Sequence, residues 1–373
     1  MLRVKLIDIN IQAYSIEECK VVFKKMILFT LSSTIIFTLA ACDDSDFFSL
    51  PKDKEAAPVN TFDDGENNNE QTKADNQEEK EDVVTLPEEP LQKGDRGKDI
   101  RQLQIALNEL NYDLDLTGRF NEKTTWALTD FQFQVDGLDV TGIYDDKTKL
   151  ALEAQFHSDS QVKPGEGLPF EENSKTKDGK IVAGNPYDIL VLVNKEHALP
   201  EDFIPEDLVI PDVRFPFTED LPKKQMRKVA AEAMEKMFEA ADKEGLELFA
   251  QSGFRSFDRQ VDIFAANVEK NGEKAANKYS ARPGESEHQT GLTMDVTSAV
   301  VGFDLIIEFG ETPEGKWIEK HASDYGFIIR YPEGKENVTK YQYEPWHLRY
   351  VGKKAAQEIS KKGITFEEYL EGF

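Results

Sequence analysis

Two short segments of this 373-residue chain carry the side chains best suited to chemistry. In the first, His288 and Asp295 are seven positions apart, with a glycine between them. In the second, Glu344 precedes His347 by three positions. Two histidines and an aspartate give a zinc ion three ligands and leave the fourth tetrahedral position for water. A further carboxylate can then take the proton of that water, and Glu344 is the candidate base because three ligands are already present.

Each of these residues has a structural explanation when it is taken alone. A single histidine in a strand-containing domain is commonly a packed or surface residue. Asp295 lies between Met294 and Val296, where it would end a strand, although an acid among apolar neighbours requires a partner. The joint spacing favours the metal site. His197 and His321 have no matching partners, and we expect them to be structural or surface residues.

The pattern Ser-x-His-x6-Asp, followed about fifty residues later by Glu-x-x-His, resembles the zinc carboxypeptidases of the VanY type. These belong to a wider group with the lysostaphin-like endopeptidases and the hedgehog signalling domain. The resemblance covers most of residues 185–373. Thr293 stands where an alanine is usual and Phe254 where a tyrosine is usual. The matching segments are residues 193–200, 252–260, 281–284 and 344–352.

The resemblance implies a role for each residue of the two segments. His288, Asp295 and His347 would bind one zinc ion. Glu344 would be the general acid and base. A changed pocket wall at the two departing positions would alter substrate preference without touching this chemistry.

Three further residues acquire roles from the same resemblance. Arg255 would hold the substrate carboxylate or the developing oxyanion, and Ser286 and Gln260 would contact the substrate. An arginine suits the first task because its planar fork offers two donors to one carboxylate, and it also stabilises an oxyanion. The structural alternatives are a helix-capping salt bridge for Arg255 and local backbone hydrogen bonds for the other two.

The periodicity around these motifs predicts an α+β domain over residues 185–373. Residues 189–193 are a run of five apolar side chains, which predicts a buried strand. Residues 226–243 predict a long amphipathic helix, and residues 246–250 predict a second strand. The expected fold is a zinc peptidase domain in which helices flank a small antiparallel sheet.

A smaller all-α module is expected over residues 91–158. One amphipathic helix is followed by two copies of a turn and a helix, in which residues 117–124 are echoed by residues 141–148. Asn121 and Asp145 are positioned to cap the two helices. The whole resembles the three-helix peptidoglycan-binding domain of many cell-wall hydrolases. A helical spacer that binds nothing is the alternative.

The remaining segments are expected to be an export signal and two linkers. Residues 1–41 end in an apolar run whose last three residues, Leu-Ala-Ala, directly precede Cys42. This pattern predicts a bacterial lipoprotein signal with Cys42 as the lipidated residue. An uncleaved signal anchor is the alternative. Residues 42–90 are strongly acidic and are expected to form a disordered linker. Residues 159–184, which are polar, are expected to form a second linker.

Charge and cysteine content exclude several classes of function. The net charge of −26 argues against nucleic acid as a partner, since phosphate binding needs a basic face. The two cysteines, Cys19 and Cys42, both lie outside the expected domains, so these domains hold no disulfide framework or cysteine-ligated zinc.

We therefore expect a monomeric, membrane-tethered zinc carboxypeptidase outside the cytoplasm, facing the bacterial cell wall. It would remove the terminal D-alanine from peptidoglycan stem peptides as a D,D-carboxypeptidase. An L,D-carboxypeptidase acting on tetrapeptide stems is the first alternative. A non-catalytic lipoprotein that binds or senses the wall is the second, and an endopeptidase acting on cross-links is a weaker one.

Overall fold

The computed structural model describes residues 84–158 and 162–372, which belong to one compact unit. The predicted signal segment, the lipidation site at Cys42 and most of the predicted acidic linker lie outside the described residues. Within the described ranges, no helix is both long and apolar enough to cross a membrane.

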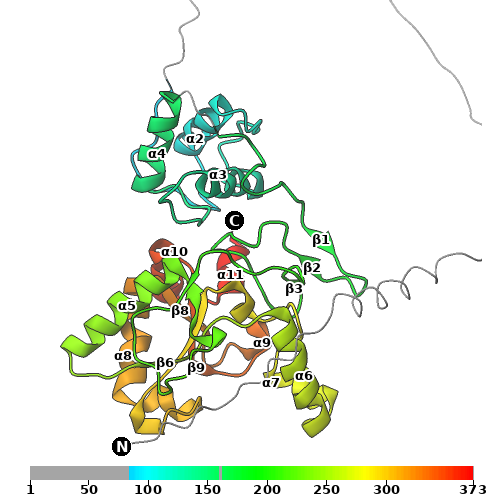
Figure 1. Ribbon diagram of the computed structural model, residues 1–373, viewed down its shortest axis with the longest axis vertical. Coiled ribbons are helices and arrows are strands. Elements are labelled where there is room, and N and C mark those ends of the chain that lie inside the picture. The colour runs from blue at the N-terminus through cyan, green and yellow to red at the C-terminus, as the bar shows by residue number, and fades with distance from the viewer. Residues whose placement is uncertain (1–83, 159–161, 373) are drawn as a thin grey trace, which may run out of the picture. The chain divides into compact units, whose positions relative to one another are not determined.

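The N-terminal module consists of three helices, as the sequence predicts (Figure 1). The side chain of Asn121 accepts a hydrogen bond from the backbone N–H of Thr124, and Asp145 accepts one from that of Thr148, so both predicted caps are confirmed. The helices are α2 (Lys98–Glu109), α3 (Glu122–Gln134) and α4 (Asp146–Phe156).

The sequence repeat of the module is also a repeat of its hydrogen bonds. Buried Gln104 accepts from the backbone N–H of Gly118 and donates to the carbonyl of Arg119. Buried Gln132 makes the equivalent pair of bonds one repeat later, with Gly142 and Ile143. Each glutamine thereby satisfies backbone groups of the turn that leads into the next helix.

The described part of residues 159–184 differs from the expected linker. Fully buried Asp130 of α3 accepts hydrogen bonds from the backbone N–H groups of Gly165, Gly167 and Leu168, at 2.9, 2.9 and 2.6 Å. This segment is therefore bound to the module. Contacts of the module also begin before residue 91, because the Tyr144 hydroxyl donates to the carbonyl of Pro87 at 2.7 Å.

The peptidase domain is built on a four-stranded antiparallel sheet, which confirms the predicted α+β class. Helix α5 (Lys228–Lys243) packs its apolar face on the sheet through buried methionines and alanines. It begins two residues later than predicted, and the strand expected over residues 246–250 is observed at residues 249–252. In sheet order the strands are β6 (Phe249–Ser252), β7 (Thr293–Thr297), β9 (Glu344–Tyr350) and β8 (Phe327–Tyr331).

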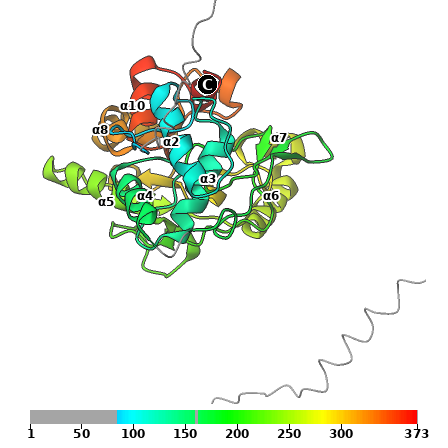
Figure 2. The ribbon, with the colours of Figure 1, turned by 90° about the horizontal axis from the view of Figure 1, so that it is seen from above.

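The other helices surround this sheet, and α6 and α7 lie on the side away from α5 in two perpendicular views (Figures 1 and 2). The α-helices are α6 (Phe257–Asn271), α7 (Glu273–Tyr279), α8 (Pro313–His321), α9 (Glu336–Thr339), α10 (Lys353–Lys362) and α11 (Phe366–Leu370). The short 3-10 helices are η1 (Pro222–Lys224), η2 (Glu287–Thr290), η3 (Ala299–Val301), η4 (Ile307–Glu311) and η5 (Ala322–Tyr325). Two-residue strands are β1 (Ser174–Lys175), β2 (Ile181–Val182), β3 (His197–Ala198), β4 (Leu208–Val209) and β5 (Met226–Arg227).

The strand predicted over residues 189–193 is wrong. These residues are largely buried, as expected, but they form no strand ladder. Two of their backbone carbonyls, those of Ile189 and Val191, instead accept hydrogen bonds from Arg349 Nη2, at 3.0 and 2.9 Å. A run of apolar residues predicts burial but does not by itself predict a strand. Here the buried Arg349 side chain, and not a neighbouring strand, is the hydrogen-bond partner of the backbone.

Candidate zinc-peptidase site

Strand pairing brings two of the predicted metal ligands together. Asp295 on β7 is the register partner of His347 on β9, so these residues, 52 positions apart in the sequence, lie side by side. His288 comes from η2, and the chain turns from there into β7 at Gly291, which has a φ of 68°. A Cβ at Gly291 would meet Arg227 Cγ at 2.9 Å, so both the turn and the packing require glycine.

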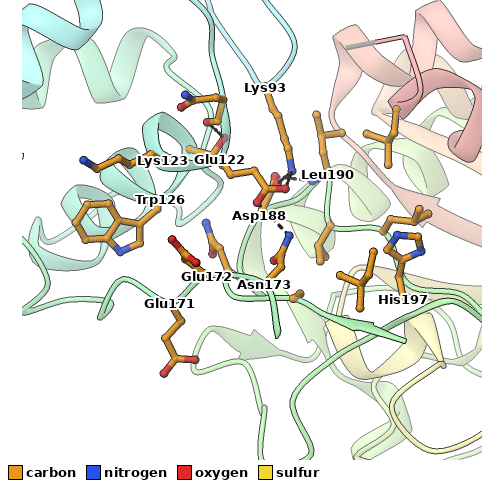
Figure 3. Close-up of a pocket in the computed structure, with 18 of the residues that line it drawn as sticks. Lys93, Glu122, Lys123, Trp126, Glu171, Glu172, Asn173, Asp188, Leu190 and His197 are labelled. Carbon is orange, nitrogen blue, oxygen red and sulfur yellow. Dashed lines mark hydrogen bonds and ion pairs between the residues drawn. The ribbon is translucent and has the colours of Figure 1, made fainter. Parts of the chain in front are cut away.

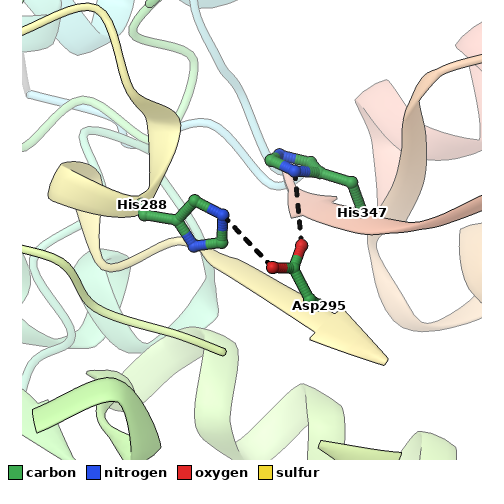
Figure 4. A group of neighbouring side chains, drawn as sticks. All are labelled: His288, Asp295 and His347. Atoms are coloured by element: carbon green, nitrogen blue, oxygen red, sulfur yellow. Dashed lines mark ion pairs between the residues drawn. The ribbon is translucent and has the colours of Figure 1, made fainter. Parts of the chain in front are cut away.

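The three predicted ligands converge on one buried point (Figure 4). His288 Nε2 is 3.5 Å from Asp295 Oδ2, and His347 Nδ1 is 3.4 Å from Asp295 Oδ1. One ligand atom from each residue lies within 4.8 Å of the other two. The histidines thus approach the aspartate from two sides, each with a different ring nitrogen.

An irregularity in β9 brings Glu344 to the same site. Residues three apart on a regular strand point to opposite faces. Between β8 and β9, however, Ile329 pairs with Leu348 while Tyr331 pairs with Glu344, so β9 has two extra residues at this point. With this bulge, Glu344 Oε2 lies 3.5 Å from His347 Nδ1.

The donor set fits a metal cation. Oδ1 of Asp295 is buried, and among the described residues it has no well-aligned hydrogen-bond donor, although His347 Nδ1 lies 3.4 Å away. An unsatisfied buried carboxylate oxygen is costly unless a cation is its partner. Two imidazoles and a carboxylate are the ligands of catalytic zinc sites. Among the described residues, His288, Asp295 and His347 could therefore hold such an ion, and these are the three ligands that the sequence predicts.

The two histidines differ in how firmly they hold a proton. Burial and the neighbouring Arg255 lower the pKa of His288 to about 3, so its ring is neutral and can act as a ligand. Burial also opposes charge on His347, but the carboxylates of Asp295 and Glu287, one beside each ring nitrogen, outweigh it and raise this pKa to about 9. A metal ion must therefore displace a proton from His347, which makes metal binding weaker at low pH.

The carboxylates differ in the same way. Burial raises the pKa of Glu344 to about 7, even though His347 and Arg255 favour the charged form. Burial acts on Asp295 too, but His288 and His347 outweigh it and hold its pKa below the ordinary value. One carboxylate is thus permanently charged, as a ligand must be, while the other can exchange a proton near neutral pH.

These groups face a cleft of about 440 Å³. Arg255 and Ser286 line it, as expected for residues that contact substrate, and Trp346 forms part of its wall. Gln260 is not among the residues that line the cleft, and its contact with substrate stays a prediction. Gln260 is buried beside the cleft, where its Oε1 accepts from Arg255 Nη1 at 3.0 Å and its Nε2 donates to the carbonyl of Ala281 at 2.6 Å. It orients the arginine.

A larger cavity, of about 870 Å³, lies away from the metal ligands (Figure 3). Lys93, Glu122 and Trp126 of the module line it together with Asp188 and His197. Lys93 Nζ is 3.1 Å from an oxygen of Asp188, and an ion pair with Glu122 at 3.5 Å completes the group. None of its lining residues belongs to the predicted catalytic set.

A buried ionic cluster that the sequence did not reveal lies next to the predicted ligands. Glu287, Arg330 and Arg349 are almost wholly inaccessible to solvent. The burial of Arg330 and Arg349 could not be predicted from their types, because charged residues are mostly exposed. Glu287 offered one usable signal, since it lies between two predicted site residues, Ser286 and His288.

The sequence also matches proteins of known family. Residues 223–353 match the family profile described as "VanY: D-alanyl-D-alanine carboxypeptidase", and residues 96–152 match a "Putative peptidoglycan binding domain". Over 227 residues the chain is 51% identical to the "Putative carboxypeptidase YodJ" of Bacillus subtilis (strain 168), which covers 61% of this chain and 80% of that protein. The chain belongs to the VanY family.

Two solved structures are similar to this VanY-family chain. One is described as "Structure of the LdcB LD-carboxypeptidase reveals the molecular basis of peptidoglycan recognition"; it is 56% identical, covers 54% of this chain and 94% of that chain, and has a TM-score of 0.52. The other is a vancomycin-resistance D,D-pentapeptidase, a point mutant of VanY in complex with Zn(II); it is 30% identical, covers 48% of this chain and 98% of that chain, and has a TM-score of 0.39.

The VanY-family chain is accordingly a zinc metallo-carboxypeptidase of cell-wall peptidoglycan. This confirms the predicted activity class and the predicted zinc. It also removes the alternative of a purely non-catalytic wall-binding protein.

Proposed function

We propose that this enzyme removes the C-terminal D-alanine from D-Ala-D-Ala pentapeptide stems, with Glu344 as its general base and Arg255 as its anchor for the terminal carboxylate. The observation that carries the proposal is the meeting of three ligand atoms and a separate, protonatable carboxylate in one cleft that also contains an arginine. A pure binding protein has no need of the fourth acidic group.

The zinc ion would be held by His288, Asp295 and His347. When bound there, it supplies Lewis-acid chemistry, which polarises a carbonyl and makes water more acidic. Everything else is the task of the chain. The ligand-bearing side of the cleft is buried, and surroundings of low dielectric strengthen the electrostatic contacts made there.

Glu344 would move the proton. As a carboxylate it accepts a proton from the attacking water, and as a carboxylic acid it returns that proton to the leaving amine of D-alanine. A pKa of about 7 suits both halves of this cycle, because neither form is strongly favoured at neutral pH.

Arg255 would read the free C-terminus. Its guanidinium lines the cleft and is held by Gln260 and by Ser252 Oγ, at 3.0 and 3.4 Å. A fixed two-donor fork suits a terminal carboxylate and disfavours a peptide that continues past the cleavage point. This argues for a carboxypeptidase over an endopeptidase.

An L,D-carboxypeptidase acting on tetrapeptide stems is the second candidate. The observation in its favour is the 56% identity to the LdcB LD-carboxypeptidase. To separate the two, the full chain is incubated with defined pentapeptide and tetrapeptide muropeptides, with and without chelator, and the products are identified by mass spectrometry. Chelator-sensitive loss of one alanine from the pentapeptide supports the proposal, and loss only from the tetrapeptide supports the second candidate. No loss from either rejects both.

We further propose that the enzyme is a monomer, lipid-anchored at Cys42, that works outside the cytoplasm next to the wall. The sequence of the N-terminal segment supports the anchor, and the peptidoglycan-binding match supports the place of work. Membrane fractionation of cells that express the wild-type protein and Cys42→Ala tests the anchor, since the variant should leave the membrane fraction. Size-exclusion chromatography tests the monomer.

A further inference from the structure

Glu287 is a buried acid that the proposed catalysis leaves without a task. It lies in η2, directly before His288, and is about 1% exposed. Its Oε1 accepts hydrogen bonds from Arg330 Nε at 2.7 Å and from Arg349 Nη1 at 2.9 Å. Its other oxygen, Oε2, lies 3.4 Å from His347 Nε2.

The two arginines are themselves held firmly. Arg330 also donates to both oxygens of Glu367 on α11, at 2.9 and 2.6 Å. Arg349 also donates to two backbone carbonyls, those of Ile189 and Val191. Because the arginines are fixed from β8, β9, α11 and the segment before β3, the direction of the Glu287 carboxylate is fixed as well.

The His347 ring therefore meets a carboxylate at each nitrogen. Nε2 faces Glu287, while Nδ1 lies 3.4 Å from the metal ligand Asp295. The rings of Tyr331 and His288 contact it, the first tilted and the second edge-to-face, with centroids 4.8 and 5.1 Å away, which limits its rotation. A carboxylate can only accept a hydrogen bond, so contact with Glu287 requires the proton to be on Nε2.

We propose that Glu287 is a positioning residue that holds the proton of His347 on Nε2, so that the lone pair of Nδ1 is aimed at the zinc ion. His288 has a weaker equivalent, because its Nδ1 lies 2.8 Å from the carbonyl oxygen of Gly253, which leaves Nε2 for the metal. An ionised partner makes a ligating imidazole a stronger donor than a carbonyl does, and loss of such a partner typically costs 10- to 100-fold in metal affinity. This inference rests on the metal site of the proposed function but not on its substrate.

The experiment measures zinc binding by the full chain, with zinc alone as the probe and a chromogenic chelator as the competitor. Three variants are compared with the wild type. Glu287→Gln removes the charge next to His347. Glu287→Asp keeps the charge for the two arginines but is too short to reach Nε2. Glu367→Gln is the matched control, because Glu367 binds the same Arg330 but does not contact His347.

Both Glu287 variants should weaken zinc binding by about 10- to 100-fold, while Glu367→Gln should stay within about threefold of the wild type. In spectra of zinc-free protein with 15N-labelled histidine, recorded at a pH at which the His347 ring is neutral, the wild type should show the remaining proton on Nε2, and Glu287→Gln should lose this preference. If Glu287→Gln does not fold, the comparison rests on Glu287→Asp.

Equal weakening in Glu367→Gln and the Glu287 variants would overturn the proposal, because it would reduce the role of Glu287 to stabilising the arginine cluster. So would wild-type zinc affinity in both Glu287 variants. Zinc binding is measured without substrate, so the proposal and the proposed carboxypeptidase activity can fail separately.

Discussion

The substitution Glu344→Gln tests the proposed mechanism most directly, because glutamine keeps the shape of the side chain but cannot take up a proton. Removing a general base typically costs 10²- to 10⁴-fold in rate, which is about 2.7–5.4 kcal/mol of transition-state free energy at 1.36 kcal/mol per tenfold. We expect kcat to fall by this amount. The zinc content should stay at one ion, since the three ligand atoms converge without Glu344.

The pH dependence sharpens this prediction. A base with a pKa of about 7 must be deprotonated to act, so the wild-type rate should rise with pH and level off above about 7. A bound cation favours the carboxylate form and moves this limb to lower pH, never to higher pH. In Glu344→Gln the limb should disappear along with the rate.

The same raised pKa makes a prediction about stability in the metal-free protein. The folded-state pKa of Glu344, about 7, lies above the ordinary 4.5, so the folded state takes up protons between these values and loses stability as pH rises through them. At 1.36 kcal/mol for each unit of pKa, the burial cost is about 3 kcal/mol above pH 7 and vanishes below pH 4.5. Apo Glu344→Gln should therefore be more stable than apo wild type at pH 8 by up to this amount.

The assay follows release of D-alanine from a defined pentapeptide by mass spectrometry, with zinc content measured on the same samples and urea unfolding on the apoproteins. Glu333→Gln, at an exposed position on the turn after β8, is the matched control and should behave as wild type. An undiminished rate in Glu344→Gln would refute its role as the base. Loss of zinc from that variant would show that Glu344 is a ligand.

Three further predictions follow from the site and the module. Asp295→Asn should lose its zinc and at least 100-fold in activity. Wild type treated with chelator should lose both as well, and added zinc should restore activity to the chelated wild type but not to the variant. An Asp295→Asn protein that keeps its zinc would contradict the ligand assignment. Arg255→Lys should lower kcat/KM on peptides with a free C-terminus by about 10- to 100-fold, while the control Arg259→Lys, at an exposed position, should not. If the wild type cleaved C-terminally amidated peptides as fast as peptides with a free C-terminus, the anchor role of Arg255 would be refuted. Asp130→Ala leaves three backbone N–H groups without their acceptor and should cost at least about 3 kcal/mol in urea unfolding, whereas exposed Asp136→Ala should cost little.

The sequence alone identified the module well, because its signals are local. A cap is formed between residues three apart, as at Asn121 and Asp145, and the amphipathic period of a helix is visible within a dozen residues. The attachment of residues 162–168 to the module could not be predicted from local signals. It depends on Asp130, a buried acid that lies 35 or more positions away from the amides it binds.

The sequence also predicts which residues would make the metal site. Histidines are few, and the joint pattern Ser-x-His-x6-Asp followed by Glu-x-x-His occurs around His288 and His347, so the donor set His288, Asp295 and His347 with a separate Glu344 could be predicted from residue types and spacing. Chemistry of this kind depends on identity and number, which the sequence contains.

Only the tertiary structure decided how these residues act. The pairing of β7 with β9 makes neighbours of Asp295 and His347, and the extra residues in β9 turn Glu344 to their side. Burial, which no single segment specifies, gives Glu344 its pKa near neutrality. It also makes Glu287 the partner of two arginines and of His347, since in a low-dielectric interior every charge must be matched by contacts from distant parts of the chain.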